Sequence, residues 1–240
     1  MKLPAKKSIW TAAAVSACAF LLSAPIARAN TITFGASGTG GDGPESASAT
    51  ITTSLNLLTI SLSSLIANPT AAGQEVSGIF VTLSNTPTSA SLSNASGTLI
   101  DIAGGGAVTP DGSTITHWGT SLTGATICLE TAGTCAVGGK PIDLIIGAGP
   151  YTNANPSITG RNPQIQNTGT FNLLVNGITA NTTVTGVTFA FGTGPDSFLE
   201  GDPTPPPPPS VPEPSSLLLL GTGVLGAAGL VRRRMLGNRS

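Results

Sequence analysis

Cys128 and Cys135 are the residues of this 240-residue chain whose type and spacing indicate the most definite chemistry. They enclose six residues with Ala132 and Gly133 near the centre, so a turn can bring the two thiols together. In an oxidising compartment, a cysteine pair this close favours a disulfide. A metal site would need more ligands, which the only histidine, His117, supplies poorly. We therefore expect a Cys128–Cys135 disulfide and no metal ligands.

His117 is also the only candidate for a histidine base. A Ser-His-Asp triad could combine it with Asp111 or Asp143, because triads assemble from distant parts of a sequence. The sequence contains neither a G-x-S-x-G elbow nor an H-E-x-x-H motif, however. A histidine without recognisable partners is more often a loop or strand-edge residue than a catalytic base. We expect no catalytic residues and no enzyme activity, with a secreted hydrolase as the less favoured alternative.

Two weaker patterns concern ligands. Residues 38–43, rich in glycine around Asp42 and close to Glu45, have the composition of a calcium loop but too few carboxylates for a tight site. Trp118 and Tyr151 could stack on sugar rings, although aromatic side chains are more often part of a core. We expect no cofactor, and a carbohydrate-binding or adhesin module is an alternative function.

Alternation of apolar and polar residues predicts β-strands through the middle of the chain. Val187, Phe189 and Phe191 alternate with other residues in the period-2 pattern of a half-buried strand. Further strand candidates cover residues 49–53, 58–62, 79–83, 99–102, 125–129, 142–146 and 171–175. Turn residues separate them. Many short strands with turns between them predict an all-β domain over residues 30–201, an antiparallel β-sandwich of jelly-roll-like type.

The domain predicted for residues 30–201 contains few charges. Two basic residues, Lys140 and Arg161, stand against nine acidic ones, a net charge of −7 that the basic chain ends reduce to −1 for the whole chain. Nucleic acids and anionic lipids require clustered Lys and Arg. The composition therefore excludes nucleic acid as a partner of this domain, whose solubility depends on Ser, Thr, Asn and Gly.

The N-terminus has the three parts of a secretion signal. Three lysines precede an apolar stretch over residues 9–24, and Ala27-Arg28-Ala29 gives an A-x-A cleavage signal before Asn30. We expect a signal peptide over residues 1–29 that passes through the Sec translocon and is cut between Ala29 and Asn30. A weak lipobox around Cys18 is the competing interpretation, but the apolar stretch continues beyond this cysteine.

The C-terminal end contains the segments of a membrane anchor in the expected order. A Pro-rich linker, predicted over residues 202–211, leads to Pro212-Glu213-Pro214. An apolar run over residues 215–231 follows, which is about 25 Å long as a helix and suffices for a thin hydrocarbon core. Arg232, Arg233 and Arg234 come next and favour the cytoplasmic side of the inner membrane. The chain before Pro212 is then expected to lie outside the membrane.

This C-terminal end resembles the PEP-CTERM sorting signal of Gram-negative bacteria. The resemblance rests on Pro212, Glu213 and Pro214, a transmembrane helix over residues 215–231 and the cluster Arg232–Arg234, all within residues 212–236. It implies an exosortase substrate, because such tails are recognised and processed by an exosortase, a membrane-embedded cysteine transpeptidase. The expected protein is anchored only transiently in the inner membrane. It then reaches the cell surface or extracellular matrix, where exopolysaccharide is the expected partner. A plain anchor is the alternative.

Overall fold

The computed structural model of the chain describes residues 29–194 and 196–204. These residues belong to one unit, which ends at Thr204. The segments predicted as signal peptide (apart from Ala29), as sorting motif and as membrane helix with its Arg cluster lie outside the described residues. Within residues 29–194 and 196–204, no helix is long and apolar enough to cross a membrane.

Strands dominate this unit, which confirms the predicted all-β class. They are β1 (Asn30–Gly40), β2 (Gly43–Ser54), β3 (Leu57–Ser64), β4 (Val76–Leu83), β5 (Ser89–Ile102), β6 (Val108–Pro110), β7 (Gly119–Thr123), β8 (Thr126–Glu130), β9 (Ile145–Ile146), β10 (Gln164–Asn176), β11 (Val184–Phe191), β12 (Ser197–Glu200) and β13 (Asp202–Thr204). Two short helices, η1 (Ala72–Gln74) and α2 (Pro156–Thr159), lie between them in the sequence.

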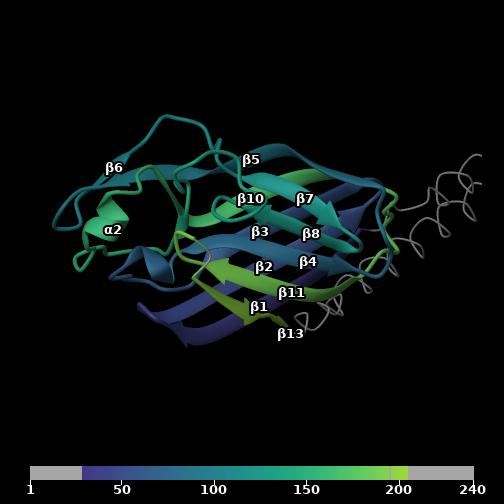
Figure 1. The fold of residues 1–240 in the computed structure, drawn as a ribbon, viewed down its shortest axis with the longest axis horizontal. Helices are drawn as coiled ribbons and strands as arrows, with labels where there is room; N and C mark the ends of the chain where they lie inside the picture. The colour runs from purple at the N-terminus through teal and green to yellow at the C-terminus, as the bar shows by residue number, and fades with distance from the viewer. Residues whose placement is uncertain (1–28, 195, 205–240) are drawn as a thin grey trace, which may run out of the picture. The chain divides into compact units, whose positions relative to one another are not determined.

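All thirteen strands belong to one mixed sheet with two wings (Figure 1). The β2 wing has the order β13-β1-β2-β3-β10-β5-β6, and the β4 wing has the order β12-β11-β4-β8-β7. The short strand β9 joins them, because it pairs with β10 in parallel and with β4 in antiparallel orientation. This arrangement differs from the two separate antiparallel sheets of a sandwich.

The two wings share one hydrophobic core. On the β2 wing, Ile51, Ile60 and Phe171 are neighbours in register across β2, β3 and β10, and all three side chains are fully buried. On the β4 wing, the equivalent row is Leu129, Ile79 and Phe189, and it belongs to the same buried cluster. Burial of each such side chain contributes about 1.5–3 kcal/mol, so the alternating residues hold the wings face to face.

A second, smaller cluster closes one end of the strands, where α2 lies (Figure 1). It contains Ala72, Ile100, Ile102, Ile146, Tyr151 and Ile158. Asn155 caps α2, since its Oδ1 accepts a hydrogen bond from the Ser157 N–H at 2.8 Å.

Both ends of the described unit lie on neighbouring strands, β1 and the edge strand β13. Ala29 is exposed and Asn30 is the first residue of β1, so cleavage between them, as predicted, would leave this strand whole. Residues 202–204, which the sequence assigns to the linker, instead form β13 and pair with β1 through Thr33↔Thr204. The proline at position 203 fits there because an edge strand tolerates a missing N–H. The folded unit thus extends three residues beyond the predicted boundary.

Candidate functional site

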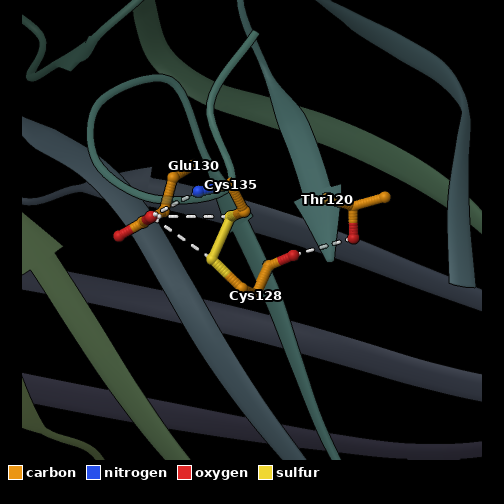
Figure 2. The surroundings of a disulfide bond; sticks show 4 residues. All are labelled: Thr120, Cys128, Glu130 and Cys135. Atoms are coloured by element: carbon orange, nitrogen blue, oxygen red, sulfur yellow. Dashed lines mark hydrogen bonds between the residues drawn. A yellow bond between two sulfur atoms is a disulfide. The ribbon is translucent and has the colours of Figure 1, made fainter. Parts of the chain in front are cut away.

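The predicted disulfide between Cys128 and Cys135 is present (Figure 2). Cys128 lies on β8, Cys135 lies in the loop that follows, and their Cα atoms are 6.3 Å apart. Closing this eight-residue loop contributes about 2–3 kcal/mol in the chain-entropy treatment. The backbone carbonyl of Cys128 accepts a hydrogen bond from Thr120 Oγ1 at 2.7 Å, which ties the cysteine to β7.

Glu130 places a carboxylate oxygen directly against this disulfide (Figure 2). Its Oε2 atom lies 3.2 Å from Cys128 Sγ and 3.5 Å from Cys135 Sγ. The side chain is buried, with only 1% of the residue exposed, and its Oε1 atom has no hydrogen-bond partner among the described residues. Burial raises the pKa of Glu130, and backbone N–H groups of Cys135 and Thr134 act in the opposite direction.

His117 does contact one of its two candidate acids. Its Nδ1 atom lies 3.4 Å from Asp143 Oδ2, and the same oxygen accepts the backbone N–H groups of Thr116 at 2.9 Å and His117 at 3.1 Å. Asp111 instead accepts the Ser113 N–H at 2.7 Å. Within the described part of the chain, no serine hydroxyl hydrogen-bonds to the histidine ring, whose hydroxyl neighbour is Thr116 Oγ1 at 3.2 Å. The pair therefore fixes the segment before β7.

The two aromatic residues considered for sugar stacking are both buried, which agrees with the favoured interpretation as core residues and contradicts the alternative of sugar stacking. Trp118 is 3% exposed, its ring centroid lies 4.4 Å from that of Phe171, and its Nε1–H donates to Asp143 O at 2.8 Å. Tyr151 is 2% exposed, and its hydroxyl donates to Gly147 O at 2.6 Å. Neither ring face is available to a sugar.

The glycine-rich segment considered for calcium is a β-hairpin, because β1 and β2 pair up to Gly40↔Gly43 around the turn. Asp42 is exposed at this turn, whereas Glu45 is buried and accepts a hydrogen bond from Ser197 Oγ. Among the described residues, three or more His, Cys, Asp or Glu donor atoms gather only at Cys128, Glu130 and Cys135.

Glu75 is a further buried acid, directly before β4. It has no exposed surface, and neither carboxylate oxygen has a hydrogen-bond partner among the described residues. The nearby amide of Gln164 donates to Ile158 O at 2.9 Å instead. Burial raises the pKa of Glu75 well above its usual value, and the nearby Gln164 amide and the positive charge of Arg161 only partly oppose this effect.

Hydroxyl groups cover the outer side of the β2 wing, opposite the core. This hydroxyl face consists of Thr31 and Thr33 of β1, Ser48, Thr50 and Thr52 of β2, Thr59, Ser61 and Ser63 of β3, and Thr168, Thr170 and Asn172 of β10. Register places Thr33, Thr50, Ser61 and Thr170 in one row across four strands, about 4.8 Å apart.

Side-chain hydrogen bonds order this hydroxyl face. Thr31 and Thr52 share one at 2.9 Å, Thr33 and Thr50 at 3.0 Å, and Thr59 Oγ1 donates to Asn172 Oδ1 at 2.9 Å. A hydroxyl that donates one bond still has lone pairs free, so the face can both accept and donate further hydrogen bonds.

The hydroxyl face ends in a pocket of about 320 Å³, which we call the Ser64 pocket. Its lining includes Ser48, Ser63, Ser64, Leu65, Asn167 and Thr168. Ser48, Ser63 and Thr168 also belong to the hydroxyl face, and the buried Ser64 Oγ makes no hydrogen bond among the described residues. Leu65 adds an apolar surface that is 56% exposed. The pocket lining is therefore uncharged, polar and partly apolar.

Sequence reasoning missed the Glu130 contact and the hydroxyl face. Glu130 follows Cys128 by two residues and directly follows the predicted strand 125–129; continuing that strand by one residue would have placed both side chains on one face and indicated the contact. The hydroxyl face was visible as Thr and Ser at alternate positions of 49–53 and 58–62. Which strands lie side by side, however, is decided by long-range pairing.

Comparison with known proteins adds a finding at the C-terminus. The family model of the PEP-CTERM protein-sorting motif matches residues 210–234. No curated protein and no solved structure matches the chain. The folded unit and this motif together define an exported protein with an all-β domain and a C-terminal sorting signal. The chain carries the PEP-CTERM sorting signal, which implies an exosortase as its processing partner and export to the cell surface.

Proposed function

We propose that this protein is a non-enzymatic surface or matrix protein that binds a neutral polysaccharide at its hydroxyl face and Ser64 pocket. The observation that carries the proposal is the pocket itself, which lies where the ordered hydroxyl rows end and has no charged residue in its lining. The proposed ligand agrees with the destination that the PEP-CTERM signal implies.

Export would proceed in the steps that the two chain ends suggest. The Sec translocon passes the chain, and cleavage after Ala29 removes the signal peptide. Residues 215–231 then hold the chain in the inner membrane while Arg232–Arg234 stay on the cytoplasmic side. An exosortase processes this anchored intermediate near Pro212-Glu213-Pro214 and passes the domain to the cell surface.

The charge of the domain favours a neutral ligand over an anionic one. Lys140 and Arg161 are the only basic residues between positions 29 and 204, so an anionic polymer would find no basic cluster there. Four acidic side chains, Glu45, Glu75, Glu130 and Asp143, are buried and leave the surface less acidic than the composition indicates. Hydroxyl groups, in contrast, exchange hydrogen bonds readily with the hydroxyls of a neutral sugar.

The Ser64 pocket has the mixed lining that a sugar ring requires. A sugar presents hydroxyl groups around its edge and C–H groups on its faces. Ser63 and Thr168 supply hydroxyls, and exposed Leu65 supplies an apolar contact. A volume of about 320 Å³ lies at the lower end of the range for small-molecule sites.

Two features support the absence of catalysis. The described surroundings of the His117 ring offer a threonine hydroxyl and a buried carboxylate, but no serine hydroxyl that the ring could activate. The lining of the Ser64 pocket contains no carboxyl pair of the type that hydrolyses glycosides.

The test is binding of the full chain to immobilised neutral polysaccharides (dextran, mannan and galactan), with anionic alginate as the counter-probe. Ser48→Glu places a larger, charged side chain at the pocket and should weaken binding at least about tenfold, which corresponds to about 1.4 kcal/mol. Thr185→Glu makes the same kind of change at an exposed position of β11, on the other wing, and should leave binding unchanged.

Three results would contradict the proposal. The first is no binding to any neutral polymer, and the second is equal loss in Ser48→Glu and Thr185→Glu. The third is new reducing ends in the polysaccharide after incubation with wild type but not with His117→Ala, because this would show hydrolysis.

A further inference from the structure

A structural disulfide does not require a buried carboxylate beside it, yet Glu130 contacts both cysteines. Disulfide sulfurs carry no proton, so neither sulfur donates a hydrogen bond to Glu130 Oε2 at 3.2 or 3.5 Å. The N–H of Cys135 lies 3.5 Å from the same oxygen, and the backbone N–H groups of Cys135 and Thr134 are the weak polar contacts that remain. Glu130 forms no ion pair with any residue in 29–194 or 196–204. A buried carboxylate without a cation is costly.

We infer that Cys128, Glu130 and Cys135 form a redox-gated metal site, in which the dithiol form of the chain binds a thiophilic divalent cation such as Zn²⁺. Two thiolates and one carboxylate are ligands that Zn²⁺ accepts, and three protein ligands leave a fourth position for water. The bound cation would supply the positive charge that Glu130 lacks.

The arrangement of the donor atoms fits such an ion. One donor atom from each residue lies within 4.8 Å of the others, and all three residues are buried. In a tetrahedral site with Zn–S of about 2.3 Å and Zn–O of about 2.0 Å, a sulfur and an oxygen ligand are roughly 3.5 Å apart. The observed separations between Glu130 Oε2 and the sulfurs, 3.2 and 3.5 Å, are close to this value. Only the two sulfurs must move apart, to about 3.8 Å.

The two redox states then exclude one another. The cysteines emerge from export as thiols, and binding of Zn²⁺ displaces their two protons while Glu130 coordinates as a carboxylate. Closure of the disulfide removes two electrons and two protons from the dithiol, and a disulfide-bearing oxidant accepts them and becomes two thiols. Because a disulfide sulfur is no longer a thiolate, closure releases the cation.

The experiment titrates the full chain with Zn²⁺ and with Co²⁺, whose thiolate complexes absorb in the near ultraviolet. The chain is reduced under anaerobic conditions, and far-UV circular dichroism checks that it remains folded. We expect one ion per reduced chain, a thiolate charge-transfer band with Co²⁺, and no binding to the oxidised chain.

The variant Glu130→Gln tests whether Glu130 acts as a metal ligand or only supports the loop. The amide oxygen of glutamine can still accept the Cys135 N–H, so the loop keeps its polar contact while the charged ligand is lost. Affinity for Zn²⁺ should fall by at least about tenfold, as it does when weaker supports of a metal site are removed. Glu200→Gln makes the same change at an exposed glutamate of β12 and should leave affinity unchanged.

Any of three results would overturn the inference: no stoichiometric binding to the reduced chain, equal affinity in wild type and Glu130→Gln, or equal binding by a Cys128→Ser/Cys135→Ser double variant. Loss of the β-sheet spectrum on reduction would also overturn it, because the site requires the folded arrangement of β8.

Discussion

The rings of Trp118 and Phe171 pack against each other across the core, with centroids 4.4 Å apart and planes tilted by 40°. Trp118 directly precedes β7 of the β4 wing, whereas Phe171 lies on β10 of the β2 wing. This pair therefore connects the two wings at a point away from β9, where they are joined by backbone hydrogen bonds.

Trp118→Ala should destabilise the domain strongly. Removal of a buried aromatic side chain leaves a cavity and costs about 3–5 kcal/mol in free energy of unfolding. Leu174→Ala is the matched control, because Leu174 is 53% exposed on β10 and its truncation should stay within about 0.5 kcal/mol. Urea denaturation monitored by far-UV circular dichroism, a signal that does not depend on tryptophan fluorescence, measures the free energy of unfolding of both variants. A loss for Trp118→Ala no larger than that of the control would show that the pair does not hold the wings together.

Glu75→Gln should change how stability depends on pH. The folded-state pKa of Glu75 lies well above 4.5, so the folded state keeps a proton that the unfolded state has lost as pH rises from 4.5. Stability of the wild type therefore falls through this window, and above it the fold contains a buried charge. The variant lacks this component: it should match wild type near pH 4, below the unfolded-state pKa, and exceed it at pH 8. A difference between the two that is constant across pH would contradict the assignment, and exposed Glu200→Gln serves as the control.

Asp143→Ala should cost more stability than His117→Ala. The aspartate accepts the N–H groups of Thr116 and His117, and a buried donor without an acceptor costs about 1–3 kcal/mol. The histidine side chain is 28% exposed and its removal leaves those bonds in place. Thermal unfolding of both variants gives the comparison. If His117→Ala is the more damaging change, the ring, rather than the carboxylate, organises this segment.

Glu213→Ala should separate membrane insertion from processing. Residues 215–231 and the Arg cluster are unchanged in this variant, so insertion should persist, while the uncut form should accumulate in the membrane because the sorting motif is damaged. Cell fractionation and C-terminal mass analysis follow the two forms. Glu200→Ala, outside the matched residues, should be processed normally. A wild-type surface form that is intact through Ser240 would leave only a plain anchor.

Local patterns predicted the parts of the fold that depend on alternation. The strands around Leu58, Val81 and Phe189 were found because their period-2 pattern matches a half-buried sheet. The candidate strand 142–146 is reduced to Ile145–Ile146 because Asp143 adopts a positive φ of 61°, which interrupts an extended chain.

Strand β1 was not found, and the reason is tertiary. Its glycines read as a loop, but the Leu199 side chain lies so close to Gly38 that a Cβ atom would be 2.7 Å from Leu199 Cδ2. The glycine therefore leaves room for Leu199 of β12 to pack closely on β1, which a single segment of sequence does not reveal. The same holds for Glu75 and Glu130, whose burial depends on strands distant in the chain. The short Cys128–Cys135 spacing needed no such information.

The pairing of β1 with β13 also sets an order in time. Thr33 and Thr204 are partners at opposite ends of the domain sequence, so their contact closes last in a chain that emerges N-terminus first. The outer edge of β1 stays unpaired, and open to association with other chains, until Thr204 has emerged and β13 can form. The β1 edge is therefore covered only after all but the last few residues before the sorting motif have emerged, because the motif begins six residues after Thr204, at position 210.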